Sequence, residues 1–197
     1  STSQQTAHQN STSGPHVKYQ TMASVKDAPS DTVTLDKQSF LTEMIRDLSG
    51  TLQDVIGIEE ASGMISIVGA TIGKDLNTQY RQQFATDQMT VDQVCHTLVD
   101  LKRRIDGGFK VTEVTREAII LENTACPFGK AVIGRKSMCM MTSNVFGKIT
   151  AENLGYARVE LKETIAQGDK GCRVVIKLNP SDSIDEIDGR EYFREDD

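Results

Sequence analysis

The period of the hydrophobic pattern changes at Asp106-Gly107-Gly108, and this change constrains the fold of the 197-residue chain more than any other feature. Before it, apolar residues recur every three or four positions, which predicts amphipathic helices. After it, they largely alternate with polar residues, which is typical of half-buried strands. A run of helices followed by hairpins predicts an α+β domain built on an antiparallel sheet.

Three helices are predicted before this point, at about 36–56, 58–84 and 91–105. Asp36 is suited to cap the first, and Thr90 with Gln93 forms the sequence of a capping box for the third. Their apolar stripes are Phe40, Leu41, Met44, Ile45, Leu48, Leu52 and Val55, then Met64, Ile67, Val68, Ile72 and Leu76, then Val91, Val94, Cys95, Leu98, Val99 and Ile105.

Small residues follow one side of the second helix. A glycine inside a helix costs about 1 kcal/mol relative to alanine, so Gly69 and Gly73 need a structural reason. Another backbone that approaches closely supplies one, either within the core or across a dimer interface, and we favour the core.

Two hairpins and a fourth helix are predicted after Gly108. The first hairpin spans about 109–115 and 118–124, and the second spans 156–166 and 172–178. Between them, a helix capped by Ser137 runs to Leu154, and Gly155 ends it. The predicted order is therefore ααα-ββ-α-ββ, with N-terminal helices packed on a four-stranded antiparallel sheet.

Polar segments flank this single predicted domain, which spans 34–179. Residues 1–33 are rich in Ser, Thr, Gln and Asn and are predicted to be a disordered tail. Residues 180–197 hold eight acidic residues and two arginines, a net charge of −6 that equals that of the whole chain. They are predicted to be an acidic tail, amphipathic enough through Ile184, Ile187, Tyr192 and Phe193 to dock on the domain or on a partner.

Composition excludes several classes of protein. No apolar run reaches the roughly 18 residues of a membrane span, and no secretory segment is present. The four cysteines are too sparse for a secreted disulfide scaffold, so we expect a cytoplasmic protein. Without a basic patch, no direct binding of nucleic acid is expected. Neither a phosphate-binding glycine motif nor a nucleophile elbow occurs.

Three cysteines fall at boundaries of predicted elements: Cys126 at a strand end, Cys139 in the first turn of the fourth helix, and Cys172 at the start of the last strand. This topology can bring them together at one end of the sheet, and a helix N-terminus favours a thiolate. Thiolates suit zinc or an iron–sulphur cluster. Cys95 belongs to the buried stripe of the third helix and is expected to be structural.

Residues 122–178 contain the motifs Glu-Asn-Thr-Ala-Cys-Pro-Phe-Gly, Ser-Met-Cys-Met-Met-Thr-Ser-Asn-Val-Phe-Gly and Gly-Asp-Lys-Gly-Cys-Arg-Val-Val-Ile. In these the chain resembles the methanogen output domain, which accompanies helix-turn-helix, PAS or kinase modules in prokaryotic signalling proteins. The helix-then-sheet order is similar to that of 4-vinyl-reductase sensor domains and haem-NO-binding-associated folds. The cysteine pattern also resembles that of SufR iron–sulphur repressors, which implies that Cys126, Cys139 and Cys172 are cluster ligands.

The fourth ligand is missing from this set. In the vinyl-reductase-type zinc site, a cysteine lies eight residues before the last one, and Thr164 holds that position here. The remaining candidates are water, a small molecule, Glu122, a glutamate of the 160–163 strand, or His96. Because structural zinc is normally closed by four protein ligands, three cysteines favour an iron–sulphur cluster over zinc.

We therefore expect a cytoplasmic sensory domain whose iron–sulphur cluster reports redox state, oxygen or iron to a signalling partner, either a kinase or a transcription regulator. A homodimer is the expected assembly. The alternative is a sensor for a small hydrophobic ligand with a structural zinc. A thiol-based redox enzyme ranks last, because His96 is the only imidazole in the predicted domain and lies three elements from the thiols.

Overall fold

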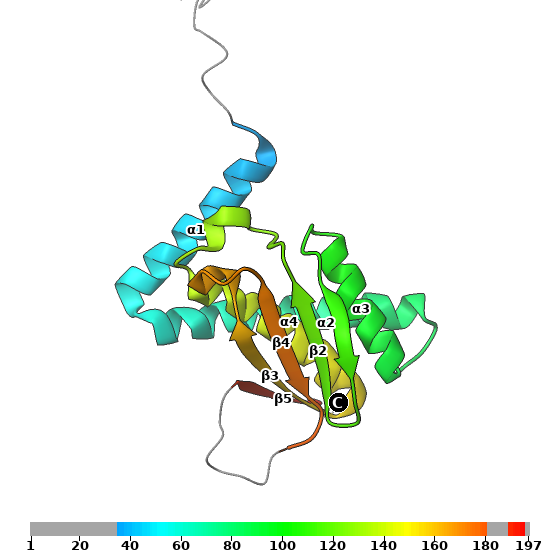
Figure 1. Ribbon diagram of the computed structural model, residues 1–197. Helices are drawn as coiled ribbons and strands as arrows, with labels where there is room; N and C mark the ends of the chain where they lie inside the picture. Colours follow the sequence, from blue (N-terminus) through cyan, green and yellow to red (C-terminus); the bar gives the residue numbers. More distant parts are fainter. Residues whose placement is uncertain (1–34, 181–188, 196–197) are drawn as a thin grey trace, which may run out of the picture. The chain divides into compact units, whose positions relative to one another are not determined.

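The computed structural model describes residues 35–180 and 189–195, and those from Asp36 on belong to one compact unit. Residues 1–33 and the isoleucines Ile184 and Ile187 lie outside the described ranges. The elements, drawn in Figure 1, are α1 (Lys37–Ile56), α2 (Ile58–Gln83), α3 (Val91–Arg103), β1 (Lys110–Val114), β2 (Ala118–Asn123), η1 (Gly129–Val132), α4 (Lys136–Leu154), β3 (Tyr156–Glu163), η2 (Ile165–Gln167), β4 (Cys172–Lys177) and β5 (Arg190–Phe193).

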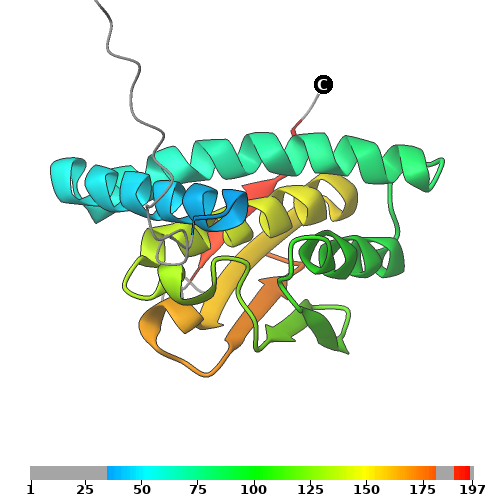
Figure 2. The same ribbon diagram turned by 90° about the horizontal axis from the view of Figure 1, so that it is seen from above.

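The strands form one antiparallel sheet in the order β1-β2-β4-β3-β5 (Figure 1). Helix α4 packs on one face of this sheet, and α2 with α1 forms the next layer beyond α4 (Figure 2). The core lies between the sheet and the helices and includes Leu98, Ile119, Phe146, Ile149 and Ile176. The predicted α+β class and its antiparallel sheet are therefore confirmed.

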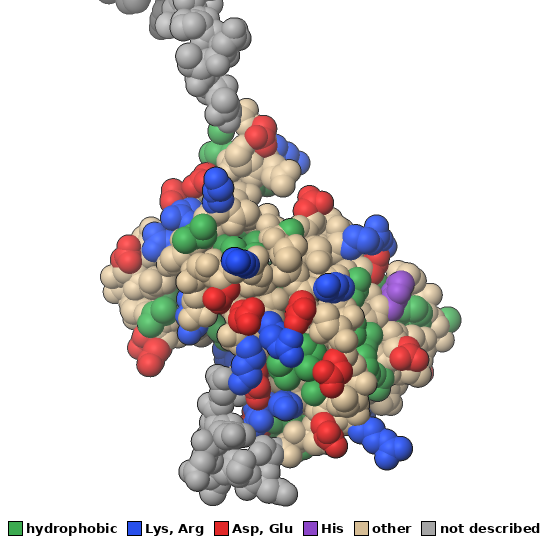
Figure 3. All heavy atoms as spheres, in the orientation of Figure 1, with side chains coloured by type: hydrophobic (Ala, Val, Ile, Leu, Met, Phe, Trp, Pro, Cys, Tyr) green, Lys and Arg blue, Asp and Glu red, His purple; other side chains and the backbone are tan. Residues whose placement is uncertain are grey.

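The open face of the sheet displays charges of both signs (Figure 3). Alternation along each strand places them there, because the neighbours in sequence point into the core. Arg173 of β4 pairs with Glu122 of β2, and Glu160 of β3 pairs with Arg158 at 3.3 Å and with Lys162 at 3.0 Å. This face thus carries ion pairs: Arg158 and Glu160 are buried on it, whereas Arg173 and Glu122 are partly exposed.

Most predicted helix boundaries are confirmed. Asp36 caps α1 by accepting hydrogen bonds from two backbone N–H groups at 2.8 and 3.0 Å, and the capping box of α3 is present. Gly155 ends α4 with φ of +95°. The predicted cap of α4 is wrong: the helix begins at Lys136, and Ser137 is a buried residue of its first turn.

The sheet has five strands, so the prediction of four is wrong. The additional strand, β5, lies in the segment predicted to be an acidic tail and pairs antiparallel with β3. Tyr192 anchors it: the ring packs on Gly147 of α4, where a Cβ atom would lie 2.1 Å from the ring, and the hydroxyl lies 3.0 Å from Ser143 Oγ. The prediction missed this short strand, with its two aromatic residues, because the surrounding segment is strongly acidic.

The small side of α2 packs on α4. A Cβ atom at Gly69 would lie 2.8 Å from Asn144 Cβ, and one at Gly73 would lie 3.0 Å from Lys148 Cβ. The close backbone approach predicted from these glycines therefore occurs within the core. No described helix is long and apolar enough to cross a membrane.

Two glycines of α2 give opposite predictions. Gly69→Ala should lower the stability of the protein, because the new methyl group meets Asn144, whereas Gly63→Ala should raise it by about 0.5–1 kcal/mol, because nothing lies within 4 Å of a Cβ atom there. Urea unfolding of both variants tests this. Equal effects of the two substitutions would contradict the close contact between α2 and α4.

Candidate functional site

The three predicted cysteines line one small cavity. Cys172 begins β4 and pairs in register with Asn123, the last residue of β2. Cys126 follows β2 after a short turn, and Cys139 lies in the first turn of α4. The cavity measures about 30 Å³, and its other lining residues include Lys102, Phe128, Val132, Met138, Thr142 and Thr164. The structure therefore brings together at one end of the sheet the three residues that the sequence singled out.

Asn123 holds the segments that carry two of these thiols. Its side-chain amide donates to the backbone oxygens of Gly107 at 3.0 Å and Ala125 at 2.7 Å. Its side-chain oxygen accepts a hydrogen bond from the backbone N–H of Cys172 at 3.0 Å. Since Ala125 precedes Cys126, one buried side chain ties the Cys126 loop to the start of β4.

Lys102 places an ammonium group among the thiols. The residue is only 5% exposed, and its Nζ donates to Thr142 Oγ1 at 2.7 Å. Nζ also lies 5.8 and 5.4 Å from the ring centroids of Phe109 and Phe146. No carboxylate of the described residues forms an ion pair with it. Burial lowers the pKa of Lys102 to about 8, although the three nearby thiol groups oppose this shift.

Burial also raises the pKa of two of the three thiols. It raises the pKa of Cys139 to about 12, with smaller contributions in the same direction from Cys172 and Cys126, while Lys102 and Lys136 lower it. Burial raises the pKa of Cys172 as well. The expected thiolate at the N-terminus of α4 is therefore not favoured without a ligand, because desolvation outweighs the helix dipole.

The thiols of the cavity are suitable ligands for a soft metal, but their present arrangement does not form a metal site. Within 35–180 and 189–195, no group of three or more His, Cys, Asp or Glu residues has an arrangement that could hold a metal ion. The cavity admits about two water molecules. A metal ion would require the sulphur atoms to rearrange from this geometry, and a multinuclear cluster would also require a wider cavity.

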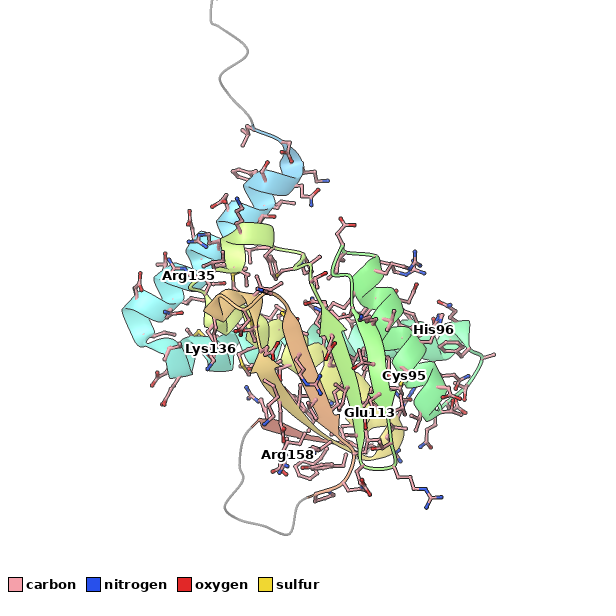
Figure 4. The ribbon with its side chains drawn as sticks, in the orientation of Figure 1. Cys95, His96, Glu113, Arg135, Lys136 and Arg158 are labelled. Carbon is pink, nitrogen blue, oxygen red and sulfur yellow. The ribbon has the colours of Figure 1, made fainter. Side chains whose placement is uncertain are left out.

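The protein side chains predicted as candidates for a fourth ligand do not line the cavity. Glu122 pairs with Arg173, and Glu160 pairs with Arg158, both on the open face of the sheet. His96 is exposed on α3, where its ring lies 5.8 Å from that of Phe84. Figure 4 shows it beside Cys95, far from the start of α4. Thr164 does line the cavity.

Lys102 and Asn123 were not predicted from the sequence. A signal for Lys102 was present, because the residue lies four positions after Leu98 on the apolar stripe of α3, where a charged residue is unexpected. Nothing in the sequence distinguishes Asn123 from other polar residues at strand ends, because its role depends on backbone groups brought in by tertiary structure.

Comparisons with known proteins bear on the fold and the family. A family model described as methanogen output domain 1 matches residues 44–177. No curated protein matches the chain. The phenol-responsive sensory domain of the transcription activator PoxR, solved with phenol, is 16% identical with a TM-score of 0.55, covering 69% of this chain and 73% of that one. A trafficking protein particle complex subunit 3 from Naegleria fowleri, covalently bound to palmitic acid, is 13% identical with a TM-score of 0.51, covering 80% and 99%.

Replacement of Asn123 tests its positioning role. Asn123→Ala should lower the free energy of unfolding by about 1–3 kcal/mol, because buried backbone groups lose their partners, and should speed alkylation of Cys126 and Cys172. The matched control is Asn179→Ala, at an exposed asparagine. Mass spectrometry of the labelled thiols reports the second effect. An unchanged labelling rate would show that Asn123 does not hold the Cys126 loop.

Proposed function

Because the chain belongs to the methanogen output domain 1 family, and is thus a signalling domain, we propose that its thiol-lined cavity is the sensory site. In this proposal Cys126, Cys139 and Cys172 bind an iron–sulphur cluster, with zinc as the alternative. The observation that carries it is the convergence of three thiols, from a loop, a helix and a strand, around one buried ammonium.

The charge of Lys102 supports a centre held by thiolates. Three thiolates outnumber the positive charges of a divalent ion or of a doubly charged cluster core, so the bound centre would carry net negative charge. A buried charge is stable only when it is paired. Lys102, which has no carboxylate partner in the described residues, would supply the opposite charge. Without the centre, the cavity holds the desolvated Lys102 beside thiols of which two, Cys139 and Cys172, have a pKa raised by burial.

An iron–sulphur cluster held by only three protein thiolates would leave one iron open to oxygen or small molecules, which is the chemistry a redox or iron sensor needs. The response of the chain would begin in the segments that the thiols hold. Cys126 fixes the loop before η1, and Cys139 fixes the start of α4. Their release would alter the surface offered to a kinase or a transcription regulator.

A second candidate is a sensor of a small hydrophobic molecule with a structural zinc, and the likeness to the phenol-bound PoxR domain favours the hydrophobic ligand. The lining of the cavity is largely apolar, as such a site requires. Ligand pockets usually measure about 300–1,000 Å³, however, so a volume of about 30 Å³ ranks this candidate below a single metal ion, and a cluster would likewise need a wider cavity. We propose a non-catalytic role for the cavity, because its lining residues include no imidazole or carboxylate that could serve as a base.

Metal analysis of the full chain, purified without oxygen, tests the proposal. We expect visible absorption with iron and acid-labile sulphide, and loss of both in each of the variants Cys126→Ser, Cys139→Ser and Cys172→Ser. Cys95→Ser is the matched control, since Cys95 is half-buried on α3 and does not line the cavity. It should retain the full metal content.

A colourless protein with stoichiometric zinc that is lost in the same three variants would show that the centre is zinc and not a cluster. A protein that binds neither metal, or one whose metal content is the same in all four variants, would contradict the assignment of the site.

Lys102→Met separates charge compensation from packing. Methionine keeps much of the side-chain volume and removes the buried charge, so the metal-free protein should be at least as stable as the parent. Metal affinity should fall by on the order of tenfold or more, because the nearby positive charge is lost. The exposed Lys110→Met is the control. Chelator competition and urea unfolding measure the two effects, and unchanged affinity would contradict the role of Lys102.

A further inference from the structure

Helix α1 is amphipathic, but it packs on the protein through its polar side and not through its apolar side. Its polar and small side faces the rest of the protein: Ser49 and Gly50 are buried, and Thr42, Arg46 and Gln53 are partly buried. Its apolar side faces solvent, with Leu48 61% exposed and Val55 75% exposed. The other exposed apolar residues of the helix are Phe40, Leu41, Met44 and Ile45. The predicted stripe exists, but the residues that the structure describes do not bury it.

The spacing of this stripe matches a coiled-coil seam. Leu41, Ile45, Leu48, Leu52 and Val55 follow one another at intervals of four, three, four and three residues, which places them alternately at the two apolar positions of a heptad. The positions that flank the seam are Thr42, Met44, Ser49 and Thr51. None of these is charged, and the nearest carboxylates, Glu43 and Asp47, lie at outer positions of the heptad, where two identical seams would hold them apart.

Helix α2 carries further exposed apolar residues. The side of α2 that carries the small residues packs on α4. The residues Met64, Ile67, Val68 and Ile72 remain exposed, and Ile67 is 70% exposed. The largest apolar patch on a typical monomer covers about 300–600 Å². Ten large apolar residues, each roughly half exposed, offer on the order of 800 Å², the area that a stable interface buries on each partner. Figure 2 shows α1 and α2 as the layer of helices farthest from the sheet.

We propose that the α1 seam, with the exposed apolar residues of α2, binds the same surface of a second copy of this chain. A two-fold interface of this kind is self-complementary and closes as a dimer. Acidic residues argue against a membrane as the occupant. The groove of about 460 Å³ along Phe40, Met44 and Leu48 is flanked by Glu43 and Asp47 and has no basic lining residue, which disfavours contact with anionic lipid.

The polar side of α1 meets the segment that carries the thiols. Arg46 donates to the backbone oxygens of Ala131, within η1, and of Ile133, just after it. Gln53 Oε1 lies 3.5 Å from Ser137 Oγ in the first turn of α4. One helix thus contacts the Cys126 loop on one side and carries the dimer seam on the other. The dimer does not depend on the proposed metal centre; only its response to the centre would.

Sedimentation equilibrium of the full chain tests this surface. The parent should be a dimer at micromolar concentration. Leu48→Glu and Ile45→Glu should raise the dissociation constant on the order of 100-fold or more, because each dimer carries the change twice. Both side chains are exposed in the protomer, so the fold should persist by circular dichroism. Ile105→Glu, at a comparably exposed residue after α3, should leave the dimer intact.

Leu48→Cys provides a second measurement. Leu48 lies at the middle of the seam, so a two-fold axis through it brings the two copies of this residue together. Mild oxidation should give a covalent dimer with Leu48→Cys and not with Ile105→Cys. A parent that is monomeric at roughly 100 µM, or a dimer unaffected by both glutamate variants, would overturn the proposal. Binding of a monomeric parent to phosphatidylcholine vesicles, lost in Leu48→Glu, would overturn it in favour of a membrane.

Discussion

The desolvated ammonium of Lys102 is the interaction on which the proposed site depends. It lies under α4, between two aromatic rings and three thiols, with a single hydroxyl as its hydrogen-bond acceptor among the described residues. A core built for stability alone would place an apolar residue there, because a buried cation without an anion is costly. The position makes physical sense when the thiols carry negative charge, and a bound metal is the ordinary way to stabilise thiolates at neutral pH.

The fold supplies the thiols from three directions. The hydrogen bonds of Asn123 join the end of β2, the Cys126 loop and the start of β4, while α4 presents Cys139 from above the sheet. Glycines allow α2 to lie close on α4, and this leaves the apolar side of the α1–α2 layer facing outward. The same helix α1 that contacts the Cys126 loop therefore carries a surface suited to another molecule. In a signalling domain, a site and a contact surface joined by one helix give a change at the site a short route to a partner.

Local sequence signals predicted most of the fold. Capping residues located the starts of α1 and α3, alternation located both hairpins, and turn glycines located the end of α4. The convergence of Cys126, Cys139 and Cys172 followed from topology, since neighbouring antiparallel strands bring one strand's end beside another's start. These are short-range rules, and they failed at one place, the start of α4, where Ser137 lies inside the helix rather than capping it.

The other predictions that failed required tertiary information. Periodicity shows that a helix has an apolar side, but not whether its own protomer covers that side, so the exposure of Leu48 and Ile45 was not foreseen. Strand β5 was hidden because Tyr192 finds its place only through Gly147, which lies far away in the sequence. Desolvation likewise reversed the expected state of Cys139, because the burial of a first-turn residue depends on what packs over the helix.

X-ray absorption at the metal edge of the anaerobically isolated chain tests the central claim most directly. We expect sulphur atoms to dominate the nearest neighbours of the metal, with an additional shell of iron neighbours if the centre is a cluster. A metal surrounded only by nitrogen and oxygen atoms, or a protein that holds no metal while its three cavity thiols remain intact, would contradict this claim.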